Sequence, residues 1–173
     1  MKSTFPLLIF FIFCFAECNK HKKELKADNP YGLPNATQTG ANIFACRMNG
    51  RNFIAFNDKD HLGATHYSDT LIIGGSPKQS YFQTILFQLN SNVSEGNTYT
   101  VNNANVVAKY ITDSLCTGLV GNIYQFNALN GSIQLTKFDK SNKIASGKLD
   151  LTIPIINCDT LKITDGRFDV HYN

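Results

Sequence analysis

The sequence lacks tryptophan, and it also lacks the short motifs that mark several common classes of enzyme. It has no glycine-framed serine elbow of the hydrolase type, no glycine-rich phosphate loop and no Cys-x-x-Cys pair. A hydrolase or a nucleotide-dependent enzyme is therefore not indicated, and we expect neither a cofactor nor an enzymatic activity. Lysine and arginine form no basic stripe, so we also expect no nucleic-acid partner.

No apolar run is long enough to cross a membrane, although a short one lies near the start of the sequence. Residues 4–16 (TFPLLIFFIFCFA) are almost all apolar and follow Lys2. A membrane-spanning helix needs about 20 apolar residues, whereas about a dozen after a positive start are typical of a secretory signal. A cysteine that closes such a run is the mark of bacterial lipoprotein processing. We therefore predict that residues 1–17 are a signal peptide and that Cys18 becomes a lipidated N-terminus, which attaches the protein to a membrane.

The segment after Cys18 has almost no apolar periodicity. Residues 18–41 contain two prolines, two glycines and four lysines, and these lysines account for much of the net charge of +3. Such a composition is typical of a flexible tether. Lysines next to a lipid anchor would lie near anionic headgroups.

The remaining residues, 42–173, have the length of one domain and a hydrophobic period of two. In GKLDLTIPI, Leu149, Leu151, Ile153 and Ile155 share one face, and GRFDVHY alternates in the same way. Residues 81–89 (YFQTILFQL) carry apolar groups on both faces, which predicts a central strand covered on each side. We expect an all-β antiparallel domain of about nine or ten strands, and the pattern leaves a sandwich and a meander barrel equally open.

Turn residues separate these runs. The pairs Asn49-Gly50 and Asn130-Gly131 each predict a tight hairpin, and residues 139–142 predict a third connection. Asp165-Gly166-Arg167 lies between two alternating runs, where a glycine suits a strand bulge. We expect Arg167 to pair with Asp165 or Asp169; the functional alternative is an arginine that grips an anionic ligand.

Residues 57–69 (NDKDHLGATHYSD) hold the densest group of potential metal ligands, namely Asp58, Asp60, His61, His66 and Asp69. The segment lacks the glycine and the glutamate of an EF-type calcium loop, and its histidines are not spaced as in a helical zinc site. We interpret it as a solvated loop without a metal, with a metal-assisted enzyme as the weaker alternative.

Three cysteines lie in the β-domain: Cys46, Cys116 and Cys158. An exported domain can keep a disulfide. We favour Cys116 with Cys158 because both flank loops, whereas Cys46 lies in a strand and suits a small apolar role. The pairing of Cys46 with Cys158 remains an alternative.

The stretches LPNATQTGANIFACRMNG (33–50) and ITDGRFDVHY (163–172), with GSIQLTKFDKSNKIASGKLDL between them, resemble a family of small Bacteroidota lipoproteins of unknown function. The resemblance implies an exported, lipid-anchored, single β-domain and implies no activity. The triplets that begin at Asp69, Asp113 and Asp159 resemble the O-glycosylation acceptor of such bacteria, which makes Thr70, Ser114 and Thr160 candidate modification sites. The basic residues after Cys18 favour the periplasmic face of the outer membrane, since surface-export tags there are acidic.

Two functions of different classes follow. The first is a non-catalytic module of the cell envelope that binds an unknown ligand or protein. The second is a lipocalin-like barrel that binds a small apolar molecule. The apolar groups on both faces of residues 81–89 suggest this alternative.

Overall fold

The computed structural model of the chain describes residues 29–173 apart from 56, 79–81, 102–103, 117 and 119. The signal peptide and Cys18 lie outside the described residues. The described part is all-β, as predicted, and none of it forms a helix that could cross a membrane. Its strands are β1 (Ile43–Met48), β2 (Arg51–Ile54), β3 (Leu62–Tyr67), β4 (Thr70–Gly75), β5 (Gln83–Leu89), β6 (Thr98–Thr100), β7 (Val106–Ser114), β8 (Val120–Asn127), β9 (Asn130–Asp139), β10 (Ile144–Ile153) and β11 (Leu161–His171).

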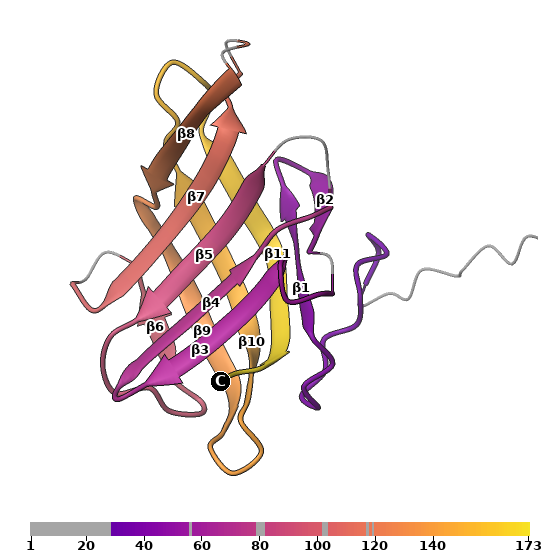
Figure 1. Cartoon of the computed structure of the whole chain (residues 1–173), viewed down its shortest axis with the longest axis vertical. Helices are drawn as coiled ribbons and strands as arrows, with labels where there is room; N and C mark the ends of the chain where they lie inside the picture. Colours follow the sequence, from indigo (N-terminus) through magenta and orange to yellow (C-terminus); the bar gives the residue numbers. More distant parts are fainter. Residues whose placement is uncertain (1–28, 56, 79–81, 102–103, 117, 119) are drawn as a thin grey trace, which may run out of the picture.

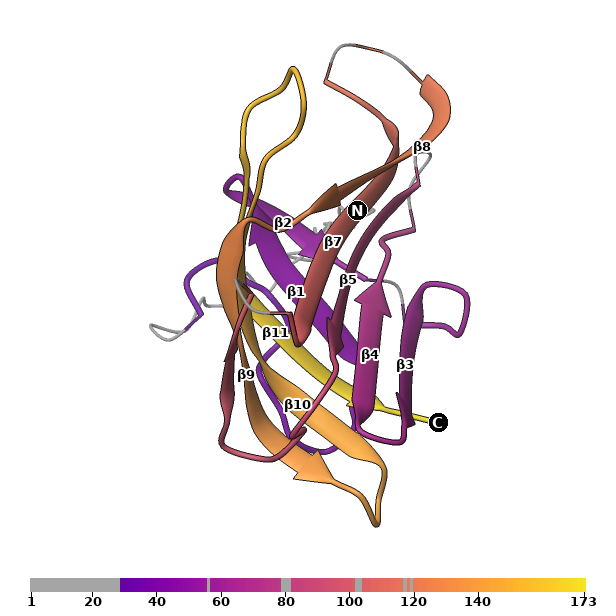
Figure 2. The same cartoon turned by 90° about the vertical axis from the view of Figure 1, so that its left-hand side faces the viewer.

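These strands form two antiparallel sheets that face each other as a sandwich (Figures 1 and 2). The six-stranded sheet has the order β2-β1-β11-β10-β9-β6, and the five-stranded sheet has the order β3-β4-β5-β7-β8. Figure 1 shows the strands of the two sheets crossing obliquely. Between the sandwich and the barrel that the sequence left open, the described strands therefore favour the sandwich.

Apolar side chains from alternate positions fill the space between the sheets. Phe87 of β5 meets Phe168 of β11 across this space, with ring centroids 5.1 Å apart, and both rings are buried. The other large, fully buried side chains of the core are Phe44, Leu71, Ile73, Ile85, Leu89, Ile133, Leu135, Leu149 and Ile153. This packing gives no support to an apolar ligand held inside a barrel.

Two of the three predicted turns are confirmed. Asn49 and Gly50 both have positive φ and join β1 to β2, and residues 140–143 join β9 to β10. The hairpin predicted at Asn130-Gly131 is wrong, because the chain there passes from the five-stranded sheet to the six-stranded one, and both residues pair with β10 instead.

Two further predictions about strands are wrong. β5 is central in its sheet but buries only one face: Ile85, Phe87 and Leu89 point into the core, while the other face carries partly exposed side chains. Residues 57–69 are not a loop throughout, since residues 62–67 form β3, the edge strand beside β4. Alternation within LGATHY was the signal for this strand, but its small and polar residues make that signal weak.

Residues 29–41, which the sequence assigns to a flexible tether, lie against the outer face of the six-stranded sheet; we call this segment the strap. The carboxylate of Asp169 accepts hydrogen bonds from the hydroxyl of Thr37 (2.5 Å) and from three strap amides, those of residues 39, 40 and 41 (2.8–3.0 Å). Leu33 is buried, and the Arg47 guanidinium lies 3.7 Å from the centre of the Tyr31 ring. The strap is therefore part of the folded unit.

A disulfide joins Cys116, in the β7–β8 connection, to Cys158, in the β10–β11 connection. This is the pairing that the sequence favours, and Cys46 is a free thiol buried in the core. Burial raises the pKa of the Cys46 thiol to about 12, so that this thiol stays protonated. The disulfide ties together the two sheets at one end of the sandwich.

Candidate functional site

The outer face of β10 and β11 carries ionisable side chains in successive rows. Lys148 of β10 lies directly opposite Arg167 of β11, and Ser146 lies opposite Asp169. Asp150 follows Lys148 on the same face of β10, next to the point where the β10–β11 register shifts. A pair of cations therefore lies between Asp169 on one side and Asp150 on the other.

A β-bulge in β11 shapes this site. The register of β11 shifts against both β10 and β1 between residues 163 and 167. Asp165 has a positive φ of 54°, and Gly166 packs so closely that a Cβ there would lie 2.3 Å from the Leu149 carbonyl oxygen. The predicted bulge is thus confirmed, although Asp165 rather than the glycine takes the left-handed conformation.

Arg167 does not form the predicted pair with Asp165 or Asp169, since it makes no ion pair with any described residue. Its Nε donates to the backbone carbonyl of Asp165 (3.3 Å), and Nη1 donates to the carbonyl of Pro34 in the strap (3.2 Å). The Asp169 carboxylate is already occupied by the strap and by the Ser146 hydroxyl (2.6 Å). The arginine therefore holds the strap while keeping its positive charge uncompensated.

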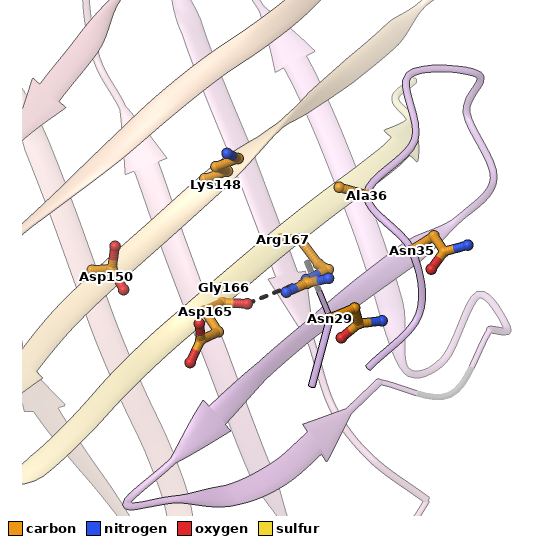
Figure 3. A pocket seen from close by; sticks show the side chains of 8 residues that line it. All are labelled: Asn29, Asn35, Ala36, Lys148, Asp150, Asp165, Gly166 and Arg167. Carbon is orange, nitrogen blue, oxygen red and sulfur yellow. Dashed lines mark hydrogen bonds between the residues drawn. The ribbon is translucent and has the colours of Figure 1, made fainter. Parts of the chain in front are cut away.

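Between the strap and the two strands lies an open cleft of about 590 Å³ (Figure 3). Its lining comes from two parts of the chain that are far apart in sequence: Asn29, Asn35 and Ala36 of the strap, and Lys148, Asp150, Asp165, Gly166 and Arg167 of the sheet. Asn29 is 8% exposed, and its Oδ1 has no hydrogen-bond partner among the described residues, while its Nδ2 donates to the Leu33 carbonyl. A buried acceptor without a donor is rare in proteins.

The electrostatics of the cleft follow from these positions. Partial burial raises the pKa of Asp150, and the nearby negative charge of Asp165 raises it as well, against the lowering effects of the Asp165 backbone N–H and of Lys148. Asp150 and Asp165 thus form an acidic pair beside the Lys148–Arg167 pair. Like charges directly opposite each other in a sheet destabilise it, and this applies to Lys148 and Arg167. The negative charge of Asp165 also disfavours the ionised form of Asp150.

The structure does not bring the predicted metal candidates together. Asp58 contacts His61 (Oδ1 to Nδ1, 2.6 Å), and this hydrogen bond lowers the pKa of Asp58. His66 lies on β3 and packs edge-on against Phe138 and Tyr172, at centroid distances of 5.2 and 5.4 Å. Among the described residues, no group of three or more His, Cys, Asp or Glu side chains could hold a metal ion, and Asp60 and Asp69 join no such group.

The three candidate glycosylation sites lie in different settings. Thr160 is exposed in the connection before β11. Thr70 begins β4 and is partly buried, and the backbone of Ser114 at the end of β7 is bonded to the Thr112 hydroxyl. Accessibility therefore favours Thr160 over the other two.

The cleft was not predicted as a unit, although parts of its signal are in the sequence. Alternation assigns Lys148 and Asp150 to one wet face, and an arginine that binds an anion is one of the two interpretations of Arg167. The pattern does not give the register that sets Lys148 opposite Arg167. It also does not indicate that the strap folds over these two residues. Comparison with known proteins yields no match for this chain among family models, curated proteins or solved structures.

Proposed function

We propose that the chain is a non-catalytic binding module of the cell envelope and that its ligand site is the cleft between the strap and strands β10 and β11. The observation that carries this proposal is the Lys148–Arg167 pair, two cations directly opposite each other in an open cleft with no carboxylate paired to either among the described residues. Such an arrangement costs stability, and a bound polar ligand would offset that cost. The buried Oδ1 of Asn29, which lacks a donor, supports the same interpretation.

The proposed setting of this module is the periplasmic face of the outer membrane. The apolar run before Cys18 supports export and lipid attachment, and the resemblance to Bacteroidota lipoproteins agrees with it. With the strap folded onto the sheet, the tether proposed between the anchor and the domain is limited to residues 18–28. The ligand would then be a component of the envelope or a small molecule of the periplasm.

A panel of polar ligands tests this function. The thermal midpoint of the full-length chain, purified in a non-ionic detergent, would be measured with amino acids, sugars, phosphates and short peptides in turn. We expect at least one class to raise the midpoint of the wild type but not of Lys148→Gln, because Lys148 lines the cleft. Lys162→Gln is the matched control, since Lys162 is an exposed lysine of β11 that does not line the cleft. If no class stabilises the wild type, or if Lys148→Gln responds equally, the cleft is not the binding site.

A further inference from the structure

The charges in the cleft are arranged in two adjacent pairs of opposite sign. Lys148 and Arg167 form one pair, and Asp150 and Asp165 form the other. We propose that the cleft binds a small zwitterion, with its anionic group at the Lys148–Arg167 pair and its ammonium group at the Asp150–Asp165 pair. This inference rests on the proposed function and specifies its ligand class.

The cationic pair is available to an anion. Lys148 makes no ion pair with any described residue, and its side chain is exposed. Arg167 uses Nε and Nη1 on backbone carbonyls, so the remaining guanidinium N–H groups stay available to an anionic oxygen. A carboxylate or phosphate between the two side chains would relieve their mutual repulsion.

The acidic pair suits an ammonium group for the same reason. The Asp165 backbone N–H lies close enough to the Asp150 carboxylate to lower its pKa, and this carboxylate keeps further acceptor capacity. Both residues are exposed and line the cleft, and Figure 3 shows their side chains on the neighbouring strands β10 and β11. An ammonium group supplies three donors and one positive charge, which these two acids lack.

Asn29 gives an observation independent of the charges. Its Oδ1 is an acceptor with no partner among the described residues, although only 8% of the surface of Asn29 is exposed. An unpaired buried acceptor is unfavourable, and an N–H or O–H donor of a ligand that reaches this oxygen from the cleft would satisfy it. The strap therefore contributes recognition as well as cover.

The spacing of the two pairs sets the size of the ligand. Lys148 and Asp150 are two residues apart on one strand, which separates their Cβ atoms by about 7 Å. The charged groups of a matching ligand should lie a similar distance apart. Amino acids with the amine at the end of a short chain meet this condition, whereas glycine is too short.

Calorimetric titration of the full-length chain in a non-ionic detergent tests the proposal. The probe is δ-aminovalerate, and valerate and pentylamine are its single-charge controls. We expect δ-aminovalerate to bind several-fold more tightly than either control, by up to about fivefold for each ion pair that the control lacks, because each exposed ion pair contributes up to about 1 kcal/mol. Glycine should bind less tightly than δ-aminovalerate.

Three variants assign the two ends of the ligand. Lys148→Gln should weaken δ-aminovalerate binding by up to about fivefold and leave pentylamine unaffected. Asp150→Asn should do the reverse, weakening δ-aminovalerate while leaving valerate unaffected. Lys162→Gln should change none of these affinities. Each variant replaces an exposed side chain, and its thermal midpoint without ligand controls for folding.

Several results would overturn the proposal. If valerate or pentylamine binds as tightly as δ-aminovalerate, the ligand is a simple ion, and the proposed function stands without the zwitterion. If no probe binds while another class in the panel stabilises the wild type but not Lys148→Gln, a zwitterion with its charges about 7 Å apart is excluded and the cleft remains the site. If neither the probes nor the panel bind, both proposals fall.

Discussion

Asp169 is the residue on which the attachment of the strap depends. Burial of a carboxylate raises its pKa, but hydrogen bonds from Ser146, Thr37 and the amides of Ala41 and Gly40 outweigh burial and hold the pKa of Asp169 at about 2. The side chain is 1% exposed. Five donors around one buried carboxylate mean that the ionised form is strongly favoured in the folded state.

Replacement of Asp169 by asparagine should destabilise the protein. An amide has one acceptor oxygen and adds two donors where the site already supplies five, so several donors lose their partner. We expect the free energy of unfolding to fall by about 2–4 kcal/mol, measured by urea denaturation. Asp159→Asn, at an exposed loop position, should change it by less than about 0.5 kcal/mol. Equal effects of the two substitutions would contradict this role.

Asp169 also makes the free energy of unfolding depend on pH under acidic conditions. Because the pKa of Asp169 is lowered in the folded state, its stabilisation is present above the unfolded pKa and is lost as the pH falls from about 4 through about 2. Urea midpoints measured across this window should fall steeply for the wild type and less steeply for Asp169→Asn. Parallel curves for the two proteins would show that another group controls the loss of stability in acid.

Among the strands, the bulge in β11 is the feature that shapes the site. It offsets the register so that Arg167 faces Lys148 while Asp165 lies near Asp150. Gly166 allows β10 and β11 to approach closely at this point. The bulge is thus the local cause of the two charge pairs.

Gly166→Ala should therefore be costly. Its Cβ would lie 2.3 Å from the Leu149 carbonyl oxygen, a backbone atom that cannot move without separating the strands. We expect a loss of about 2–4 kcal/mol in the free energy of unfolding. Gly63→Ala on β3 is the matched control: a Cβ there meets nothing within 4 Å, and alanine should be neutral or stabilise by up to about 1 kcal/mol. The same denaturation measurement decides between these results, and a neutral Gly166→Ala would contradict the packing.

The disulfide should stabilise the connections that it joins. It closes a loop with a sequence separation of 42 residues, for which chain entropy predicts about 4 kcal/mol of stabilisation. Reduction, or the double substitution Cys116→Ser and Cys158→Ser, should lower the free energy of unfolding by about 2–4 kcal/mol. Urea unfolding of Cys46→Ala with and without reductant is the control, and it should respond to reductant as the wild type does. A wild type that is insensitive to reductant would contradict the pairing.

The sequence predicted correctly those elements whose signals lie in neighbouring residues. Asn49-Gly50 acted as expected because both strands of that hairpin belong to one sheet. Asn130-Gly131 has the same composition, yet it lies where the chain changes sheets, and no local pattern reports that change. β3 was missed because Gly63, Ala64 and Thr65 give little hydrophobic contrast. The disulfide pair was favoured correctly because both cysteines flank loops.

At the scale of the whole molecule, the strap is the main feature in which the structure differs from the sequence prediction. Proline and glycine make residues 29–41 resemble a tether, but long-range contacts with Asp169, Arg167 and Arg47 hold the segment on the sheet. Contacts between residues about 130 positions apart are not encoded in a local pattern. The cleft depends on these contacts, so its polar residues were predicted only as separate strand faces.

Removal of the strap tests its contribution to the fold. A chain that begins at residue 42 loses the buried Leu33 and all four strap donors to Asp169, whereas one that begins at residue 29 keeps them. We expect the shorter chain to be less stable by several kcal/mol, on the order of 3–6, in urea denaturation. Equal stability of the two chains would mean that the strap contributes no folding energy.

The cleft under the strap is the proposed ligand site, and mapping of amide chemical shifts would locate the ligand on the structure. The full-length chain would be titrated with the ligand class that stabilises it most in the panel. We expect shifts at the strap and at Lys148, Asp150, Asp165 and Arg167, with β3 and β4 unchanged. Shifts confined to the edge strand β8, or to the core between the sheets, would contradict it.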